Sequence, residues 1–259
     1  MSSNSPTSPH GHRVAAIYDI HGNLPALEAV IADVRRAGAD LVVMGGDVLP
    51  GPMARESLAY LRALDLPLLG IMGNGDREVL ARRRGETNDA VPEVARPALE
   101  WCADQIDDED AAQIAGWPAT TTVTIDGLGD VCFCHATPRD DNEIFTRLTD
   151  ADRLRPIVEA PGTPVVVCGH THMQFDRMVG ATRVVNAGSV GMPFQDAGAY
   201  WVLLGPGVEL RRTAYDLDAA AARISATAYP GAGEFATRHV RHPPSEADML
   251  AALGRAELR

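Results

Sequence analysis

The chain has 259 residues, of which 46% are hydrophobic, and a formal net charge of −12. This length suits one large domain or two small ones, and the composition is that of a globular protein with a full core. The acidic balance argues against a protein that holds long nucleic acid by surface charge. No apolar run approaches the roughly 20 residues of a membrane-spanning helix, so no membrane partner is expected.

The first twelve residues, MSSNSPTSPHGH, are polar and rich in Ser and Pro, without the basic-then-apolar pattern of a signal peptide. We expect residues 1–12 to be a disordered lead-in, and the protein to be cytoplasmic. No two cysteines have the CxxC spacing of a zinc or redox motif. We therefore expect reduced, mostly buried thiols at all four positions, Cys102, Cys132, Cys134 and Cys168.

The first part of the chain alternates between two kinds of pattern. Short apolar runs predict strands at residues 13–19, 39–47 and 67–76. Amphipathic spacing predicts helices at residues 24–38 and 53–64, and a longer helical section at about 92–115. Strands that alternate with helices in this way indicate βαβ units and a mainly parallel sheet.

From Thr120 the pattern changes to β-branched alternation around Asp126-Gly127, which indicates a hairpin. Helices are expected near Asn142–Arg147 and Asp150–Ala160. Further strands are expected at Pro164–Cys168, Gln174–Val179, Thr182–Asn186, Ala199–Leu204 and Val208–Thr213. The second half should therefore form a mixed or antiparallel sheet packed on the first. We interpret residues 227–244 as a loop or arm, and residues 245–258 as a terminal helix capped by Ser245.

Polar side chains follow the carboxyl ends of five expected strands, where ligands bind in open α/β sheets. They are Asp19, His21, Asp47, Asn74, Asp76, His135, His170 and His172. A spacing of two residues puts both side chains of a pair on the same side of an extended segment. Nearby glycines let the backbone turn sharply. Each piece alone is typical of an ordinary turn or cap, but the whole series favours one shared site.

The series Asp19-x-His21, Gly46-Asp47, Gly73-Asn74, His135 and Gly169-His170-x-His172 resembles that of the calcineurin-like metallophosphoesterase family, and most closely its small bacterial phosphodiesterase branch. The resemblance covers residues 13–213. It implies an α/β fold of the mixed α+β kind, a four-layer αββα sandwich in which two mixed β-sheets are flanked by helices. Residues 214–259 would then be a C-terminal arm and helix packed on this domain.

The resemblance also implies a site for two divalent metal ions. By analogy, Asp19, His21 and His172 bind the first ion, Asn74, His135 and His170 bind the second, and Asp47 bridges both. Such mixed ligands suit Mn²⁺, Fe²⁺, Zn²⁺ or Ni²⁺ more than Mg²⁺ or Ca²⁺. The ions would generate hydroxide at neutral pH and offset the charge of the attacked phosphoryl group. Asp47, Asn74 and His135 are the expected catalytic residues, and Asn74 is also expected to contact substrate.

The chain departs from the family pattern at Gly75, where many members have a His that contacts phosphate and is suited to protonating the leaving group. Without it, we expect diesters or esters with stable leaving groups, cyclic nucleotides being one example. Asp76 is expected either to orient a metal ligand from behind or to cap the next helix. Arg139 is a candidate for a phosphate contact or for a surface salt bridge, and Arg77 is a weaker candidate of the same kind.

The turn that begins at Asn186 resembles the family's "NPGS" turn, and its glycines are expected to serve packing. Residues 192–194 are expected in the core or along the pocket.

Three functions stay open at this point. The first is a phosphodiesterase acting on small organic phosphates, which a net charge of −12 permits if cations occupy the site. The second is a phosphomonoesterase or a dinucleoside polyphosphate hydrolase. The third is a non-catalytic protein-binding scaffold of the same fold, although such scaffolds tend to lose metal ligands. A metallo-β-lactamase-like hydrolase would need a compact His-x-His-x-Asp-His run, which this chain lacks. The sequence is compatible with a homo-oligomer but does not indicate one.

Overall fold

The structure is a computed structural model that describes residues 10–258. Most of the expected lead-in lies outside the described residues, but its end differs from the expectation. His10–Gly11 form a short strand, β1, which pairs in parallel with β5 (Thr120–Ile125). The rings of His10 and His12 lie 3.1 and 2.5 Å from the Asp126 carboxylate, which holds this segment against the hairpin.

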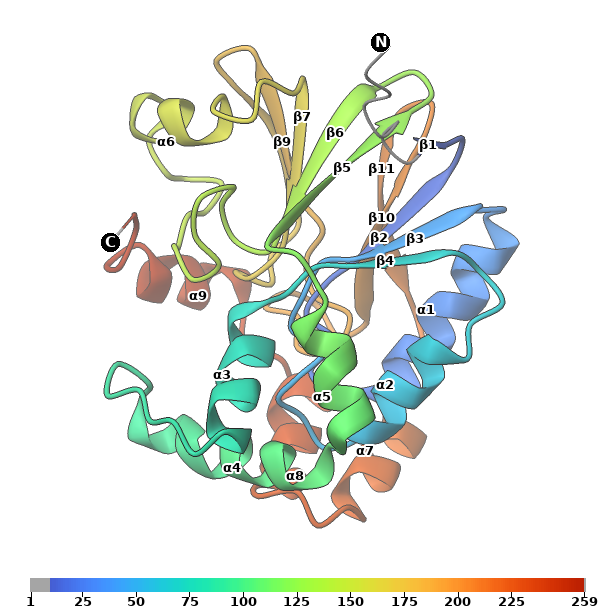
Figure 1. The fold of residues 1–259 in the computed structure, drawn as a ribbon, viewed down its shortest axis with the longest axis vertical. Helices are drawn as coiled ribbons and strands as arrows, with labels where there is room; N and C mark the ends of the chain where they lie inside the picture. The colour runs from blue at the N-terminus through green and yellow to red at the C-terminus, as the bar shows by residue number, and fades with distance from the viewer. Residues whose placement is uncertain (1–9, 259) are drawn as a thin grey trace, which may run out of the picture.

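The first of two mixed sheets has five strands (Figure 1). Its order is β11 (Val208–Thr213), β10 (Ala199–Leu204), β2 (Val14–Ile17), β3 (Leu41–Met44) and β4 (Leu68–Gly70). Strands β2, β3 and β4 are parallel, as the alternation of strands and helices predicts, whereas β10 runs antiparallel to both of its neighbours. The parallel register brings the carboxyl ends of β2, β3 and β4 to the same edge.

The second sheet has six strands and is built mainly from the second half of the chain. Its order is β1, β5, β6 (Gly129–Cys134), β7 (Val165–Cys168), β9 (Thr182–Asn186) and β8 (Phe175–Val179). Strands β5 and β6 form the predicted hairpin, and β6, β7 and β9 are parallel. The carboxyl ends of β6 and β7 therefore also meet at one edge.

Strands in the middle of each sheet are apolar on both faces because both faces are covered. Val43 and Phe133 lie in a core between the two sheets, whereas Cys132 and Cys134 point to the opposite face, toward the helix α6 (Ala151–Val158). Burying each such Val or Phe contributes roughly 1.5–3 kcal/mol. The four cysteines are free and buried, which confirms the expectation of reduced thiols.

Helices complete the predicted four-layer sandwich. The outer face of the five-stranded sheet is covered by α1 (Leu24–Arg36), α2 (Ala54–Arg62), α4 (Arg96–Gln105) and α5 (Asp108–Ala115). Helix α3 (Asn74–Arg83) follows β4, and the short η1 (Glu93–Ala95) leads into α4. Two of these helices, α1 and α5, begin at capping residues, because the side chains of Asn23 and Asp107 accept backbone N–H groups of the first turn. None of the helices within residues 10–258 has the length and apolar character needed to cross a bilayer.

The prediction of a helix near Asn142–Arg147 is wrong. These residues form an irregular loop because their polar side chains bond to the local backbone instead of leaving it free for a helix. The N–H of Asn142 donates to the Asp140 carboxylate at 2.7 Å, and the N–H of Thr146 donates to the Thr149 hydroxyl at 2.8 Å. Phe145, whose apolar character suggested a helix face, is buried against α6.

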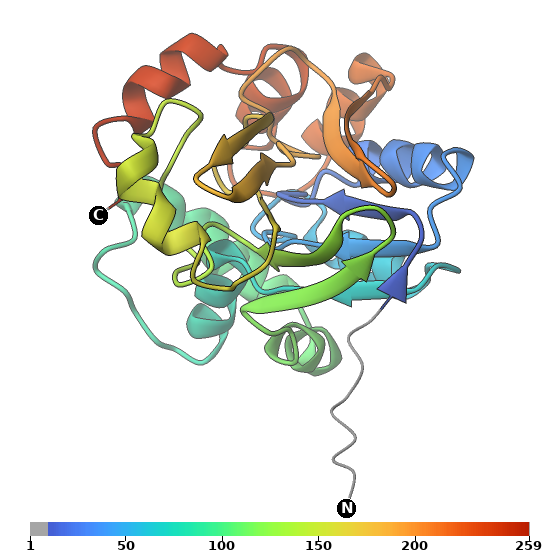
Figure 2. The ribbon, with the colours of Figure 1, turned by 90° about the horizontal axis from the view of Figure 1, so that it is seen from above.

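The segment expected to be a loop or arm, residues 227–244, contains helical structure. It holds α8 (Ala232–Phe235) and a π-helix, η2 (Ala236–Arg241), which pack with α7 (Leu217–Ser225) in a small core of their own. Helix α8 packs against α7, and Figure 1 shows both at the lower end of the molecule. The terminal helix α9 (Glu246–Leu253) begins as predicted, because the Ser245 hydroxyl accepts the N–H of Asp248 at 3.2 Å. Figure 2 shows α9 near α6, at the other sheet.

Candidate metal centre

The seven expected metal ligands converge at the carboxyl ends of the strands. Asp19 follows β2, Asp47 follows β3 and Asn74 begins α3 just after β4, all from the five-stranded sheet. From the six-stranded sheet, His135 follows β6, while His170 and His172 follow β7. Asp19, Asp47 and His135 are at most 4% exposed. The structure therefore brings together side chains that lie up to 153 positions apart in the sequence, from Asp19 to His172.

The backbone at these positions is unusual. Among residues 10–258, six residues other than glycine have positive φ angles, and five of them are expected ligands with φ between 45° and 64°. Those five are Asp19, His21, Asp47, His170 and His172. A side chain in this left-handed region costs about 1 kcal/mol or more, and such strain persists where the surrounding structure enforces it, often at functional sites. The turns are therefore shaped to aim these side chains inward.

One group of donor atoms is formed by Asp19, His21 and His172. The Nε2 atoms of the two histidines are 3.2 Å apart, and Oδ1 of Asp19 lies 3.4 Å from Nε2 of His172. The ring of Phe194 stacks on His172 with centroids 4.7 Å apart, which fixes the plane of that imidazole. These contacts leave three donor atoms facing a common point.

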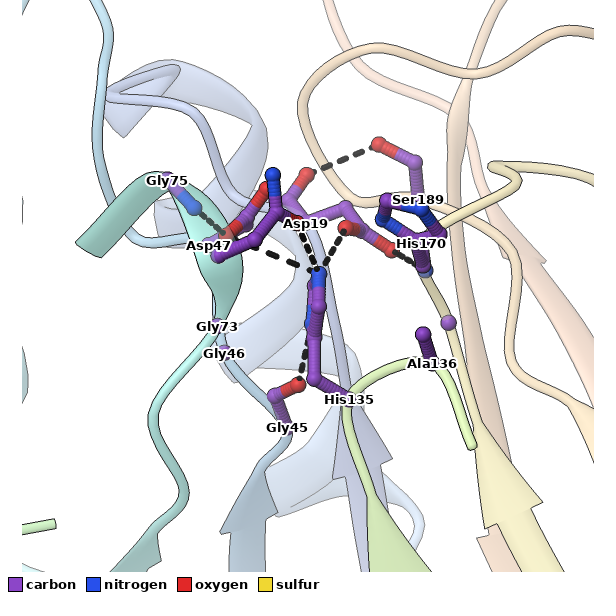
Figure 3. A network of polar contacts seen from close by, with 12 residues as sticks. Asp19, Gly45, Gly46, Asp47, Gly73, Gly75, His135, Ala136, His170 and Ser189 are labelled. Carbon is purple, nitrogen blue, oxygen red and sulfur yellow. Dashed lines mark hydrogen bonds and ion pairs between the residues drawn. The ribbon is translucent and has the colours of Figure 1, made fainter. Parts of the chain in front are cut away.

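A second group is formed by Asp19, Asp47 and His135. Nε2 of His135 lies 3.5 Å from Oδ1 of Asp47 and 3.9 Å from Oδ1 of Asp19 (Figure 3). The amide oxygen of Asn74 is 3.0 Å from the same Nε2 atom. The other carboxylate oxygen of Asp47 is 3.7 Å from Nε2 of His21, in the first group. The carboxylates of Asp19 and Asp47 thus both lie between the two groups, whereas the family resemblance implied a bridging position for Asp47 alone.

His170 lies at the side of the second group. Its backbone N–H donates to Oδ2 of Asp19 at 2.9 Å, and its ring centroid is 5.2 Å from that of His135. Its Nε2 atom is 3.2 Å from the carbonyl oxygen of Asn142, in the loop wrongly expected to be a helix. That loop therefore orients a candidate ligand.

Three imidazoles are oriented in the same way. The Nδ1 atoms of His21, His135 and His172 are 3.2, 2.9 and 2.7 Å from the carbonyl oxygens of Pro50, Gly45 and Met192. A carbonyl can only accept, so Nδ1 carries the proton and the lone pair of Nε2 points into the cluster. This arrangement is typical of metal-binding histidines.

The donor set fits divalent metal ions. Oδ1 of Asp19 is buried and has no hydrogen-bond partner among the described residues, which costs several kcal/mol for a carboxylate unless a cation approaches it. The Nε2 lone pairs of His21 and His172 face one another at 3.2 Å without a proton to share. Two ligands of one transition-metal ion, each about 2.1 Å from it, are roughly 3.0–3.4 Å apart. The spacings within each group are close to that range.

Without a bound cation, the buried ionisable groups of the site shift one another's pKa values. Burial favours a raised pKa for Asp19, but attraction to His172, His135 and His21 outweighs burial and lowers the pKa to about 2. Burial and the charge of Asp19 raise the pKa of Asp47 well above its usual range. Burial lowers the pKa of His21 to about 3, so its ring is neutral at pH 7. Neutral imidazoles beside crowded carboxyl groups are suited to binding cations.

Asp76 supports the candidate metal centre from behind and also takes part in the start of α3. Its carboxylate accepts the N–H groups of Asp47 at 2.8 Å, Leu49 at 3.0 Å and Gly73 at 3.1 Å. The bond from Gly73 belongs to the start of α3, where Asp76 is the third helical residue rather than the cap itself. The other two bonds fix the loop that carries Asp47.

Gly75 contributes its backbone where the family pattern has a side chain. Its N–H donates to Oδ1 of Asp47 at 2.7 Å. A Cβ atom at this position would lie 2.4 Å from the carbonyl oxygen of Leu49, so the loop as folded has no room for a side chain. The sequence did not predict this donor role.

Two further supporting residues come from the turn after β9, where only the glycines were expected to matter. The hydroxyl of Ser189 donates to the backbone carbonyl of Asp19 at 2.7 Å (Figure 3). The side-chain amide of Asn186 donates to the carbonyl of Gly169 at 2.7 Å. The signal available in the sequence was the presence of polar residues at the end of a buried strand. Ser189 connects the loops of the two sheets, and Asn186 holds the loop after β7.

The two arginine candidates are paired with carboxylates. Arg139 forms an ion pair with Glu143, its Nε atom 3.0 Å from Oε2, and it lines a cavity separate from the metal cluster. The structure therefore does not place Arg139 at the site, and the surface salt bridge is what it shows. Arg77 lies beside the cluster but binds Asp141 at 2.7 Å and Glu78 at 2.7 Å.

A family model and solved structures match most of the chain. The sequence model of the calcineurin-like phosphoesterase superfamily domain matches residues 13–205. An uncharacterized protein of Methanocaldococcus jannaschii is 29% identical over 163 residues, which are 62% of this chain and 63% of that relative's length. This match thus spans less than two thirds of the relative.

Two crystal structures are similar over most of the chain. A metallophosphoesterase from Sphaerobacter thermophilus is 26% identical, with a TM-score of 0.66 over 88% of this chain and 97% of its own. A hypothetical protein from Pyrococcus horikoshii has a TM-score of 0.71 over 90% of this chain and 99% of its own; at 18% identity it shows the fold alone. The matched residues contain all of the strand-end ligands, and the chain belongs to the calcineurin-like phosphoesterase superfamily.

Proposed function

We propose that this protein hydrolyses phosphodiester bonds of small organic phosphates, using two divalent ions such as Mn²⁺, Fe²⁺, Zn²⁺ or Ni²⁺. The observation that carries the proposal is the buried Oδ1 atom of Asp19, which has no hydrogen-bond partner among the described residues and faces the Nε2 atoms of His172 and His135. Such an atom needs a cation. When bound, two such ions make water acidic enough to attack at neutral pH and offset negative charge on phosphoryl oxygens.

The residues of the chain have separable roles in this proposal. Asp47 would bind both ions, because its two carboxylate oxygens face different histidines, His21 and His135. Asn74 and His135 would hold the second ion, and Asn74, which lines the neighbouring cavity, would also contact the substrate. His21, His135 and His172 are held in one tautomer by backbone carbonyls, so that they bind without reorientation.

Two features favour diesters over monoesters. Gly75 leaves no side chain at the position from which a leaving group could be protonated, so a leaving group that is stable without a proton is preferred. The nearby Arg77 is already paired with Asp141 and Glu78. A phosphodiester has one negative charge and a monoester nearly two at neutral pH, so the diester requires less positive charge from the protein.

The proposal is tested with bis-p-nitrophenyl phosphate and Mn²⁺ after treatment with a chelator. Asp47→Asn is expected to lower kcat/KM about 100-fold or more, because even residues that only support metal ligands cost 10–100-fold. Asp65→Asn, an exposed carboxylate paired with Arg35, is the matched control and should keep wild-type activity. A wild-type protein without metal-dependent hydrolysis, or an Asp47→Asn variant of undiminished activity, would exclude the proposal.

A further inference from the structure

The metal cluster opens onto a cavity of about 920 Å³, which is large for water and ions alone. His21, Asp47 and Asn74 lie at one end of it. Much of the wall comes from two parts of the chain that do not supply ligands, residues 88–99 and residues 229–239 of the C-terminal segment, and Ile144 and Met192 are also part of it. The space is therefore continuous with the proposed catalytic site and offers room for the organic part of a substrate.

The walls of this cavity are largely apolar and partly aromatic. Val91, Leu99 and Met192 contribute aliphatic surface, and Tyr229 and Phe235 contribute rings. The rings brace one another, since Tyr229 packs edge-on against Trp101 at 5.3 Å and against Phe235 at 6.1 Å between centroids. A braced aromatic wall favours a flat, rigid partner over a hydrated sugar.

Polar residues such as Arg77, Glu78 and Asn88 also line the cavity, but His239 is the polar residue beside its aromatic part. The ring of His239 lies 5.1 Å from that of Phe235, and its Nδ1 atom is buried without a hydrogen-bond partner among the described residues. Burial lowers the pKa of His239 to about 4, so the ring is neutral at pH 7. A neutral imidazole offers one donor and one acceptor. The residue also belongs to the π-helix η2, a rare conformation that is frequent at functional sites.

We propose that this cavity binds a heteroaromatic ring of the substrate, such as a nucleobase, with His239 as the hydrogen-bonding partner that selects it. This inference rests on the proposed function and names the substrate class for the same site. An alkyl chain would fit the apolar walls but would offer no hydrogen bond to the part of the His239 ring that lines the cavity, which is unfavourable. A hydrated sugar would not match the apolar walls formed by Val91, Leu99 and Phe235. Only a ring with polar atoms at its edge matches both.

The test measures binding to the full-length, Mn²⁺-loaded protein by calorimetry, with adenosine monophosphate, ribose 5-phosphate and octyl phosphate as probes. The wild type should bind adenosine monophosphate at least about 10-fold more tightly than the other two, since stacking of a base on aromatic side chains contributes roughly 1–3 kcal/mol. His239→Phe keeps the ring but not the hydrogen bond and should weaken adenosine monophosphate about 10-fold. It should leave ribose 5-phosphate unchanged.

Two further variants guard this result. His239→Gln retains a hydrogen-bonding edge and should recover most of the affinity if the bond matters, which a loss of folding would not allow. His242→Phe makes the same replacement at an exposed histidine three residues on and should bind like the wild type. Equal affinity for adenosine monophosphate and ribose 5-phosphate, tightest binding of octyl phosphate, or unchanged preference in His239→Phe would each overturn the inference.

Hydrolysis of bis-p-nitrophenyl phosphate by the same samples separates the two proposals. Metal-dependent hydrolysis without a preference for adenosine monophosphate overturns the assignment of the cavity alone. A preference that depends on His239, in a protein without hydrolysis, supports the cavity assignment and overturns the proposed phosphodiesterase activity.

Discussion

The loops at the strand ends, which carry the candidate metal ligands, differ from the C-terminal segment that lines part of the cavity. The loops have left-handed residues, buried donor atoms and hydrogen bonds that cross between the two sheets, such as that from Ser189 to Asp19. The segment around η2 forms a small apolar core with α7. It also contains the buried Nδ1 atom of His239, which has no hydrogen-bond partner among the described residues. The comparison suggests that chemistry and substrate choice are carried by separate parts of the chain, so that changes in one should leave the other intact.

The largest expected effect comes from Asp19→Asn, which tests the loops. The amide removes the charge that a cation would balance, so affinity for Mn²⁺ should fall at least 100-fold. The wild type should gain about 2.7 kcal/mol of stability at a Mn²⁺ concentration 100 times its Kd, and the variant should gain little. Thermal unfolding with and without Mn²⁺ measures both. The idea of a strained, cation-requiring oxygen fails if the variant gains as much from Mn²⁺ as the wild type.

A smaller effect is expected from Phe235→Leu, which tests the segment. The residue is 5% exposed and packs with Ala221 and Val240, so the substitution should cost about 1 kcal/mol and lower Tm by roughly 2–4 °C. KM for bis-p-nitrophenyl phosphate should rise several-fold, whereas affinity for Mn²⁺ should stay within about twofold. If affinity for Mn²⁺ falls while KM rises, the two regions are not separable, and the contrast between them fails.

The smallest effect is expected from Arg139→Ala. Arg139 is exposed, and its buried partner Glu143 also accepts the hydroxyl of Thr137 at 2.9 Å, so Glu143 keeps a hydrogen bond in the variant. Activity toward phosphodiesters should therefore change by less than about twofold. A loss of tenfold or more in kcat/KM would return Arg139 to the phosphate site that the sequence pattern suggested and the structure does not show.

The sequence predicted that these polar side chains would meet, because strand ends are local features. An apolar run followed by Asp19 or His170 shows where a strand stops, and parallel pairing then places those stops together. The spacing of the ligands therefore carried most of the geometry of the site.

The parts that sequence reasoning missed depend on contacts over long distances or on competition within a loop. Nothing in the spacing of Phe235 or His239 indicates that they face a cavity, because the other wall lies more than a hundred residues earlier, at Val91 and Leu99. Asn142–Arg147 has apolar positions suited to a helix, but side-chain bonds to the backbone were favoured instead. Arg139 could reach either phosphate or Glu143, and only the fold distinguishes the two.

The division of the ligands between the sheets has a consequence for how the protein matures. Asp19, Asp47 and Asn74 belong to one sheet and His135, His170 and His172 to the other, so a bound ion would cross-link two halves of the chain. Neither half alone presents a complete site. An incompletely assembled chain would thus lack part of the proposed metal site, and binding of metal would report that the two sets of ligands have come together.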